Sequence, residues 1–356
     1  MILVAPDSFK ECLDAAHVSG ILVDEFRRLR PDWEVAACPL SDGGEGFAGI
    51  LTAALGGRRI PVRVTGPLGT PVQAFFGKAG ETGIIEVASA CGLALVPPER
   101  RDPLRTTTRG VGELLLAAAG AGCRELLVGL GGSATCDGGV GMMGVPGVAE
   151  LRGRIALRAF CDVDNPFVGP AGAARVFGPQ KGADAAAVEL LEVRMREQAA
   201  VMFARTGVDV SALPGAGAAG GLAGALHACL GAELVPGIET LLGYLDFAVL
   251  AARADWIVTG EGSSDRQTLG GKVPMGVLRH ASGVPVALIS GRIRDRERLS
   301  AAGFARLVEV SPPELPLPEA LRPDIAGMNL RRAAADFVAG CARLTRSSGS
   351  PGGDRG

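Results

Sequence analysis

Hydrophobic and polar positions alternate in a regular rhythm at both ends of the chain. Short apolar runs bounded by glycine or proline are typical of buried strands, and longer stretches with an apolar residue every three or four positions are typical of amphipathic helices. This pattern predicts strand, helix, strand and helix at residues 2–5, 11–30, 35–40 and 47–55. The rhythm returns with strands at 284–290 and 305–310 and a helix at 328–344. Such alternation predicts a parallel sheet covered by helices.

The middle of the chain has a different texture. Short strands separated by glycine and proline turns favour mixed or antiparallel sheet, and they are predicted at residues 60–64, 72–76 and 83–87. A helix at 111–119, a strand at 125–130 and a long helix at 184–206 follow. We therefore predict an α/β protein with two domains. A doubly wound parallel-sheet domain, Rossmann- or flavodoxin-like, is built from residues 1–58 and 275–345 and is interrupted by a second, mixed α/β domain at 59–274.

Composition and charge remove several classes of protein. A chain of 356 residues is long for a single core, which agrees with two domains. The net charge of −2 and the lack of a basic block argue against nucleic acid and anionic membranes as partners. No apolar run approaches the ~18 residues of a membrane span, and the start lacks the basic segment of a signal peptide.

The cysteines and the last residues add two expectations. The eight cysteines are scattered, with no Cys-x-x-Cys pair, so we expect reduced thiols in a cytoplasmic protein. Residues 346–356 are rich in glycine and serine and have little to bury, so they are predicted to form a disordered tail. The sequence leaves the oligomeric state open, including a homo-oligomer.

Five glycine-rich loops carry the candidate chemistry. Glycine lets backbone N–H groups approach an anion closely, and a following helix adds its positive end, which suits phosphates. For any one loop, a tight turn or a helix cap is the alternative interpretation. The occurrence of five together favours phosphate binding, although none matches the P-loop pattern. The loops lie at residues 41–46, 131–139, 178–182, 215–221 and 259–265.

One of these loops spells the dinucleotide-binding pattern G-x-G-x-x-G at residues 215–220. In a nicotinamide-binding oxidoreductase this pattern closes a buried strand and opens a helix. Residues 208–214 are instead polar at alternate positions and end in Pro214. The context therefore does not support an oxidoreductase.

Lysines and acids lie in or near the loops. Lys10, Lys181 and Lys272 could each place a charge on a phosphate, or be solvated surface residues. Mg²⁺ takes oxygens from one or two carboxylates together with substrate phosphates. Asp7 directly follows the first strand, at the sheet edge where ligands bind in open α/β folds. From spacing alone, Asp7 could equally cap the following helix.

Taken in order, eight motifs resemble the type I glycerate kinase family. They cover residues 1 to about 345 and read APDSFK (5–10), DGGEG (42–46), RDPLRTTTRG (101–110), GGSAT (131–135), CDVDNP (161–166), FGPQKG (177–182), PGAGAAGG (214–221) and TGEG (259–262). The resemblance implies ATP- and Mg²⁺-dependent phosphorylation of D-glycerate to 2-phosphoglycerate. It also implies two domains with the active site in the cleft between them, and it assigns the 215–221 loop to this family.

With the resemblance in view, we assign each candidate residue a role as a hypothesis. Asp7 is expected to act as the base toward the glycerate hydroxyl, with Lys10, Lys181 and Asp42 completing the catalytic set. ATP is expected to contact Gly131, Gly132, Ser133, Gly215, Gly217, Gly220 and Glu261. The substrate set is Ser8, Arg105, Arg109, Asp162 and Asn165, in which a guanidinium fork suits the carboxylate. The candidate Mg²⁺ ligands are Asp42, Asp162 and Asp265.

The chain departs from the family in ways that keep two alternatives open. Cys136 stands where the family usually has asparagine, and Ser263 lies where a basic residue is usual. Residues 144–155 form a much shorter connection than family members carry between Gly139 and Cys161. One alternative is a kinase for another small hydroxy acid. The other is a pseudo-kinase impaired by the shortened 144–155 stretch, whose loss should also expose apolar surface.

Overall fold

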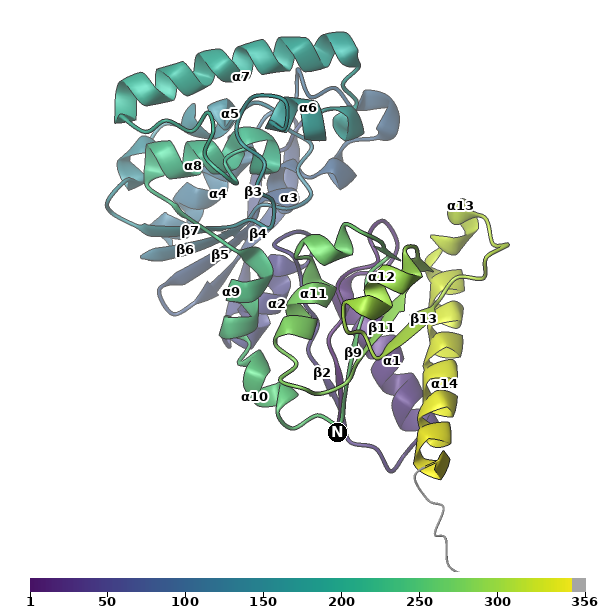
Figure 1. Cartoon of the computed structure of the whole chain (residues 1–356). Helices are drawn as coiled ribbons and strands as arrows, with labels where there is room; N and C mark the ends of the chain where they lie inside the picture. The colour runs from purple at the N-terminus through teal and green to yellow at the C-terminus, as the bar shows by residue number, and fades with distance from the viewer. Residues whose placement is uncertain (348–356) are drawn as a thin grey trace, which may run out of the picture. The chain divides into compact units, whose positions relative to one another are not determined.

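The chain folds into two compact units in the computed structural model, which describes residues 1–347. The first unit combines residues 1–40 with the residues from 246 onward, and the second unit is the continuous stretch 41–245. Residues 348–356, most of the predicted tail, lie outside the described residues. Figure 1 shows the elements of both units.

The first unit is built on a five-stranded sheet in which every pair is parallel. Its strand order is β13-β11-β9-β1-β2, which becomes 2-1-3-4-5 when the strands are counted along this unit. This is the flavodoxin-like, doubly wound order. The expected α/β fold, with a parallel domain made from both chain ends, is confirmed. The strands are β1 (Ile2–Val4), β2 (Val35–Ala37), β9 (Trp256–Thr259), β11 (Val286–Ser290) and β13 (Arg306–Glu309).

Two long helices cover one face of this sheet. α1 (Ala15–Leu29) and α14 (Pro323–Ser347) pack together, and their apolar residues join those of the strands in one core. Asp14 caps α1 by accepting the His17 backbone N–H at 2.8 Å, so the helix begins immediately after this residue. The unit's shorter elements are α10 (Phe247–Ala251), β10 (Ser263–Ser264), α11 (Val273–Arg279), β12 (Arg292–Ile293), α12 (Arg296–Ala301) and α13 (Leu317–Ala320).

The second unit contains a six-stranded mixed sheet with the order β3-β4-β5-β6-β7-β8. Its first three strands are antiparallel neighbours, whereas β5 to β8 run parallel to one another. The mixed character expected of the central domain is thus confirmed. The strands are β3 (Arg58–Thr65), β4 (Pro71–Ala79), β5 (Thr82–Glu86), β6 (Glu125–Gly129), β7 (Ala156–Phe160) and β8 (Glu233–Val235).

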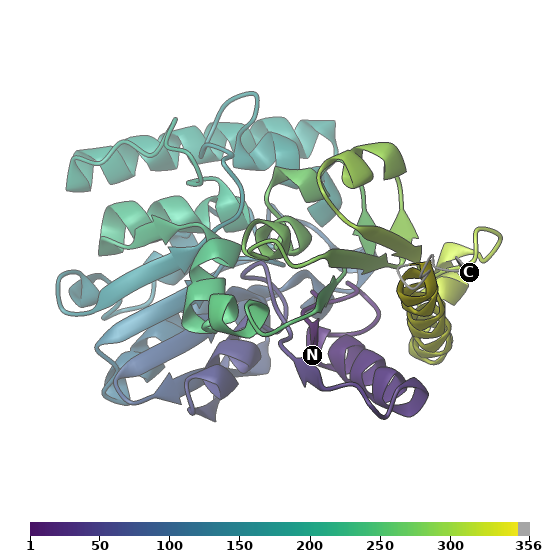
Figure 2. The ribbon, with the colours of Figure 1, turned by 60° about the horizontal axis from the view of Figure 1, so that its bottom comes forward.

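Helices cover both faces of this sheet, and one helix forms an additional layer. α4 (Arg109–Gly120) and α8 (Leu222–Leu230) lie on one face, with α2 (Phe47–Ala54) and α9 (Gly237–Tyr244) on the other (Figures 1 and 2). α7 (Ala185–Thr206) packs outside α8, against α6 (Ala173–Phe177). The remaining short helices are α3 (Val87–Cys91) and α5 (Val140–Met143).

The unit boundaries fall at 40/41 and 245/246, whereas the sequence pattern placed them at 58/59 and 274/275. The first difference arises because α2 follows β2 in the chain but packs on β3, β4 and β5 of the second unit. The second arises because β9 pairs with β1 and β11 in the first sheet. A hydrophobic pattern shows that a helix exists but not which sheet the helix covers. A strand of four residues, such as β9, is also too short to give a clear hydrophobic pattern.

The shortened 144–155 stretch closes without leaving the core open. Val145, Val148 and Leu151 are buried in the core of the second unit. The Arg152 guanidinium donates to the carbonyl oxygen of Ala228 at the end of α8. The chain thus passes from α5 to β7 through a packed turn. Among the described residues, no helix is both long enough and apolar enough to span a membrane.

Candidate functional site

In the first unit, Asp7 lies at the point where the strand order reverses. β1 is followed by β2 on one side, and the later strands extend from β9 on the other, so the carboxyl ends of β1 and β9 border the usual ligand crevice of this fold. Asp7 is 2 % exposed. Its backbone N–H donates to the Gly260 carbonyl oxygen at 2.8 Å, and its Oδ1 accepts the N–H of buried Ser8 at 2.7 Å. Asp7 and Ser8 are therefore held at the crevice.

Glu261 follows β9 and is surrounded by hydrogen-bond donors. Its Oε1 accepts the Ser264 hydroxyl at 3.0 Å and the Thr268 hydroxyl at 2.6 Å, while Lys272 Nζ lies 3.6 Å from Oε2. Ser264 Oγ is also 2.7 Å from Ser290 Oγ at the end of β11. Burial raises the pKa of Glu261, and the Lys272 ammonium and the two hydroxyls lower it in part. The buried carboxylate is thus compensated within its own unit.

Two further predicted residues belong to the same unit. Lys10 is exposed, and its charge lowers the pKa of Glu261. Lys10 therefore lies close enough to Glu261 to belong to the same cluster. Asp265 forms a turn in which its Oδ1 accepts the Gln267 N–H at 2.7 Å. We call Asp7, Ser8, Lys10, Glu261 and Asp265 the first loop cluster.

The second unit has its own cluster, at the shared carboxyl edge of β5 to β8. Asp162 follows β7 and accepts the N–H groups of Gly237 at 2.7 Å and Ile238 at 3.1 Å, at the start of α9. Burial, and then the charge of Asp42, raise the pKa of Asp162 to about 7, although the two N–H groups lower it. The structure therefore brings Asp42 and Asp162 together as an acidic pair.

The loop that carries Asp42 fits tightly against the loop after β6. The Gly131 N–H donates to the Gly43 carbonyl oxygen at 2.9 Å. A Cβ placed on Gly131 would lie 2.3 Å from the Gly44 Cα, so this position excludes any side chain. Gly132 adopts a φ of +73° and completes the turn. Asp42 itself accepts the Gly44 N–H at 3.1 Å. The close approach of the loops that carry Asp42 and Gly131 thus explains why position 131 requires glycine.

Lys181 is almost completely buried in the second unit. Its Nζ donates to Ser133 Oγ at 2.9 Å and to the Thr135 carbonyl oxygen at 2.8 Å, and burial lowers its pKa. Asp137 fixes the next turn of the same loop, with Oδ2 accepting the Thr108 hydroxyl and N–H, both at 2.9 Å. Lys181 therefore holds the 133–135 loop in place.

The G-x-G-x-x-G loop packs against the same region. A Cβ on Gly220, whose φ is +67°, would lie 1.9 Å from the Thr135 carbonyl oxygen. The Gly217 N–H donates to the Asn165 carbonyl oxygen at 2.9 Å, and Asn165 Nδ2 donates to Ala171 O at 2.8 Å. Gly215 adopts a φ of +80°. These glycines permit loop-to-loop packing. We call the loops with Asp42, Gly131–Ser133, Asp162–Asn165, Lys181 and Gly215–Gly220 the second loop cluster.

Three arginines in the 101–110 stretch differ in their partners. Arg105 is 86 % exposed and lies 3.3 Å from Asp102 Oδ2. Arg109 donates through Nε to Glu113 Oε1 at 3.2 Å. Arg101 has a buried Nε that meets no hydrogen-bond partner in the described part of the chain. Its carbonyl oxygen would lie 2.3 Å from a Cβ on Gly182, next to Lys181. The sequence motif contained Arg101, but nothing in it distinguished this arginine from the others.

Comparisons with known proteins agree along the chain. A family model described as "Glycerate kinase family" matches residues 2–154 and 145–341. A glycerate kinase from Bacillus subtilis is 40 % identical over 371 aligned positions, which cover 95 % of this chain and 97 % of that protein. The chain belongs to the glycerate kinase family. This confirms the resemblance and, because these relatives are kinases, the expected enzyme class.

Other glycerate kinase family members extend the comparison. A glycerate 2-kinase from Escherichia coli is 41 % identical over 326 positions, covering 82 % of this chain and 85 % of that protein. A solved structure from Salmonella typhimurium LT2, described as a glycerate kinase 2, has a TM-score of 0.78 and 38 % identity. It covers 97 % of this chain and 99 % of that chain, so the fold of the family extends over nearly the whole chain.

The comparison with the B. subtilis glycerate kinase bears on the shortened stretch. The alignment spans 371 positions although this chain has 356 residues, so that relative carries residues that this chain lacks. The two segments matched by the family model overlap at residues 145–154, within the 144–155 stretch.

Sequence reasoning missed Glu86, a buried acid of this family member at the end of β5. Its Oε2 accepts the Ala48 N–H at 3.2 Å, in the first turn of α2. Burial raises the pKa of Glu86 to about 7, against the lowering effect of the Ala48 and Gly46 N–H groups. Glu86 thus anchors the helix that follows the Asp42 loop. Its signal in the sequence was a single acid between the apolar residues 84–85 and 87–88.

Proposed function

We propose that this enzyme uses ATP and Mg²⁺ to phosphorylate D-glycerate, giving 2-phosphoglycerate by in-line phosphoryl transfer. The observation that carries the proposal is its similarity, over 82 % or more of its length, to proteins named glycerate kinase or glycerate 2-kinase. Every family motif except the one at residues 101–110 contributes residues to the two loop clusters. The eight free cysteines suit the reducing cytoplasm, which we propose as its location.

Phosphoryl transfer requires positioning and charge stabilisation more than covalent chemistry. In the proposed mechanism, Asp7 accepts the proton of the glycerate hydroxyl as it attacks. Its burial and its fixed backbone at the crevice support this role, because they preset the carboxylate direction. Ser8 is placed beside it for a substrate contact. Lys10, exposed at the same cluster, would bring its charge to the phosphate oxygens, and Glu261 would order the loop next to ATP.

The acidic pair is our proposed Mg²⁺ site. Burial first, and then the charge of Asp42, raise the pKa of Asp162, and a divalent cation would relieve the repulsion between the two carboxylates. The described residues contain no group of three or more metal-binding side chains, but Mg²⁺ needs only one or two carboxylates beside phosphates. When bound, Mg²⁺ would neutralise developing charge on the transferred group. Asp42 and Asp162 are the preferred ligands, with Asp265 as a further candidate.

For Lys181 the contacts support a narrower role than direct phosphate binding. Both of its observed acceptors belong to the 133–135 loop, so Lys181 would preset the backbone of Gly131, Gly132 and Ser133 for ATP. The loop with Gly215, Gly217 and Gly220 packs on the Thr135 carbonyl group and so supports the backbone of the 131–135 loop. Asn165, whose side chain is used locally, would contact the substrate through its loop.

The substrate carboxylate needs a cation. Arg105 and Arg109 remain candidates from the sequence, although each already contacts an acid. Arg101 is the third candidate, and we favour it because a buried guanidinium N–H without an acceptor gains most from a bound carboxylate.

The alternatives are a kinase for another small hydroxy acid and a pseudo-kinase. The packed closure of the 144–155 stretch favours an active enzyme over the pseudo-kinase. The test is a coupled assay for ADP release with D-glycerate, L-glycerate, tartronate and tetronates, each with and without Mg²⁺. Enolase added to the reaction identifies 2-phosphoglycerate as the product. Folded protein that binds ATP but turns over no hydroxy acid would establish the pseudo-kinase instead.

A further inference from the structure

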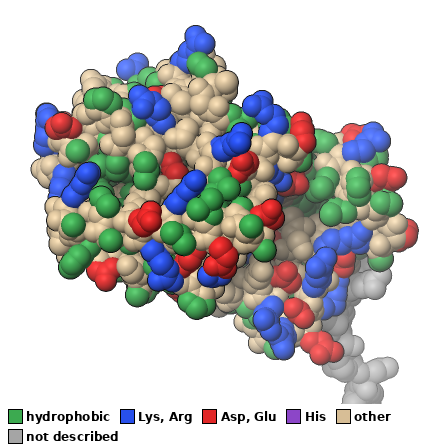
Figure 3. Space-filling view, turned by 90° about the horizontal axis from the view of Figure 1, so that it is seen from above, with side chains coloured by type: hydrophobic (Ala, Val, Ile, Leu, Met, Phe, Trp, Pro, Cys, Tyr) green, Lys and Arg blue, Asp and Glu red, His purple; other side chains and the backbone are tan. Residues whose placement is uncertain are grey.

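The outer face of α7 carries exposed apolar side chains in a single stripe. Leu190, Val193 and Val201 are 43 %, 51 % and 49 % exposed. On a helix with 3.6 residues per turn they share one side, opposite the buried Leu191 and Met195. Figure 3, a view from above the helix, shows green hydrophobic side chains mixed with blue and red ones on this surface. Single exposed apolar residues are common, but a row of them on one helix indicates a contact surface.

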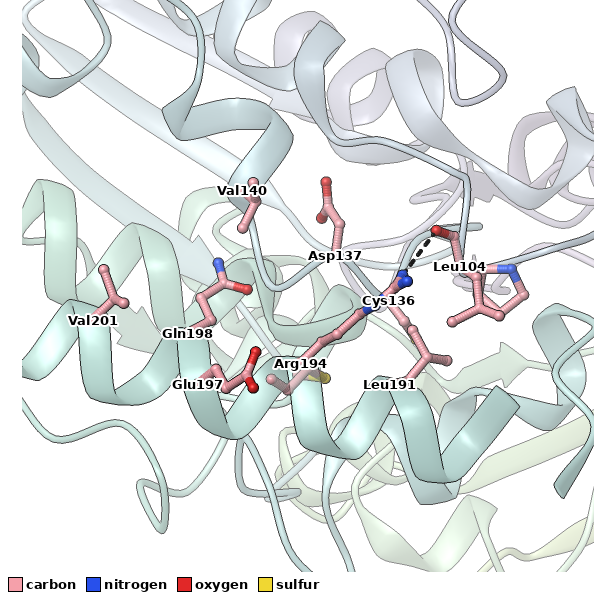
Figure 4. A pocket seen from close by; sticks show the side chains of 11 residues that line it. Leu104, Cys136, Asp137, Val140, Leu191, Arg194, Glu197, Gln198 and Val201 are labelled. Atoms are coloured by element: carbon pink, nitrogen blue, oxygen red, sulfur yellow. Dashed lines mark hydrogen bonds between the residues drawn. The ribbon is translucent and has the colours of Figure 1, made fainter. Parts of the chain in front are cut away.

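A groove runs beside this stripe. It has a volume of about 430 Å³ and is lined by α7, by residues 103–104 and by residues 136–140. Figure 4 shows Gln198 projecting from α7 toward Val140, and Arg194 extending toward the carbonyl oxygen of Leu104. Val140 is 57 % exposed and lies four residues before the shortened 144–155 stretch. The apolar surface thus continues from α7 onto the part of the fold next to that stretch.

Two opposite charges lie within the stripe. Arg194 and Glu197 are both exposed and lie between Val193 and Val201. Arg194 donates one N–H to the Leu104 carbonyl oxygen at 3.3 Å, and a guanidinium has further donors. Reversing the helix about an axis between Met195 and Arg196 exchanges position 194 with 197 and position 190 with 201. The stripe is therefore complementary to its own reversed copy.

We propose that α7 is the interface of a homodimer, in which two copies of α7 pack antiparallel across a twofold axis between Met195 and Arg196. Leu190 then packs on the partner subunit's Val201, and Arg194 pairs with the partner subunit's Glu197. Each contact occurs twice, as in any interface that uses the same surface on both subunits. The paired stripe runs from Leu190 to Val201 and is about 17 Å long at the helical rise per residue, near the middle of the 22-residue helix.

A second copy fits this surface better than a different partner does. The stripe has one positive and one negative charge, placed so that reversal matches each with its opposite. A like-charged or purely apolar partner would leave both charges without ion pairs at the contact, which is unfavourable. This inference goes beyond the proposed function and does not depend on it.

The test measures mass by sedimentation velocity and light scattering over a range of protein concentrations. We expect the full chain to be a dimer that dissociates on dilution. Val201→Asp should give a monomer. Val249→Asp, which changes a residue that is 64 % exposed on α10, should remain dimeric and serves as the matched control. Circular dichroism melting verifies that both variants are folded.

Charge reversal tests the register. Arg194→Glu alone and Glu197→Arg alone should each be monomeric, because each places two like-charged pairs in the interface. Mixing the two variants should restore a dimer, since the mixed pair has only opposite charges facing each other. A wild-type chain that is monomeric at every concentration overturns the proposal. So does a dimer that is insensitive to Val201→Asp, or a mixture of the two charge variants that stays monomeric.

Discussion

The two loop clusters differ in how their buried acids are balanced. In the first unit, Glu261 accepts two hydroxyl groups and lies near Lys272, so its charge is compensated by groups of its own unit. In the second unit, Asp162 is held by two backbone N–H groups but faces Asp42, and its pKa rises to about 7. The difference teaches that the buried Glu261 has a cation and hydroxyl donors beside it, although burial still raises its pKa, whereas Asp162 has only backbone N–H groups and faces a second carboxylate. It is the second cluster that should depend on a cation.

The largest expected effect comes from the first cluster. Asp7→Asn keeps the shape of the side chain and removes the proposed base, which should lower kcat by about 10²–10⁴-fold. Apparent Mg²⁺ affinity and melting temperature should stay near the wild-type values. Asp14→Asn is the matched control, because Asn caps a helix about as well as Asp and this residue only caps α1 and pairs with the exposed His17 ring. Steady-state kinetics with Mg²⁺ titration measure both variants. A near-normal kcat would remove Asp7 from the mechanism.

The second cluster should respond in metal affinity instead. Asp162→Asn keeps an oxygen for the Gly237 N–H but removes one of the two negative charges of the acidic pair. We therefore expect the apparent Mg²⁺ affinity to fall by about tenfold or more. Excess Mg²⁺ should restore part of the rate. Asp164→Asn changes an exposed acid two residues away and should leave the Mg²⁺ dependence unchanged. If both variants titrate like the wild type, the contrast between the clusters is wrong.

A smaller effect should distinguish the arginines of the second unit. Arg101→Gln should raise KM for D-glycerate by about 10-fold or more with little change in kcat, because a charge-assisted hydrogen bond contributes about 1.5–3 kcal/mol. Arg105→Gln, at the exposed guanidinium, should change KM far less. Initial rates over a glycerate series measure these two variants and Arg109→Gln. A larger increase in KM at Arg105 or Arg109 would indicate that one of those residues, and not Arg101, binds the glycerate carboxylate.

The smallest expected effect is on stability and comes from Glu86. Its pKa is about 7 in the folded protein against 4.5 ordinarily, so between these values the folded state holds a proton that the unfolded chain has released. Stability should therefore fall as pH rises through this window. Glu86→Gln cannot ionise and should melt a few degrees higher than the wild type above pH 7, with the gain disappearing below pH 4.5. Glu81→Gln, exposed before the same strand, should show no such trend. A pH-independent difference would show that Glu86 is not the titrating group.

The sequence predicted the first cluster better than the second. Asp7 directly follows an apolar run at the start of a strand–helix rhythm, and parallel strands bring such positions to one edge. The acidic pair could not be derived in this way. Asp42 and Asp162 are 120 positions apart, and their proximity depends on the Gly43–Gly131 contact and on the start of α9. Family motifs marked both residues, but only the structure makes them neighbours.

Glu86 and β9 illustrate two other limits of sequence reasoning. Glu86 lies inside the predicted strand 83–87, but its burial depends on α2, whose sheet the pattern does not specify. β9 is a four-residue strand whose partners, β1 and β11, are distant in sequence. Short strands are recognised only when their pairing is known. For this reason the boundary was expected at 274/275, whereas the structure has it at 245/246.

The arrangement of the first sheet has a consequence for how the chain is made. β1 leaves the ribosome first, yet one of its two neighbours, β9, begins at Trp256. The whole second unit, a continuous stretch, is synthesised in the interval and can fold as it emerges. The first 40 residues must wait as an unfinished strand–helix–strand fragment with an open sheet edge. Chaperone binding during synthesis and the slow step of refolding should therefore involve residues 1–40, the fragment that also carries Asp7.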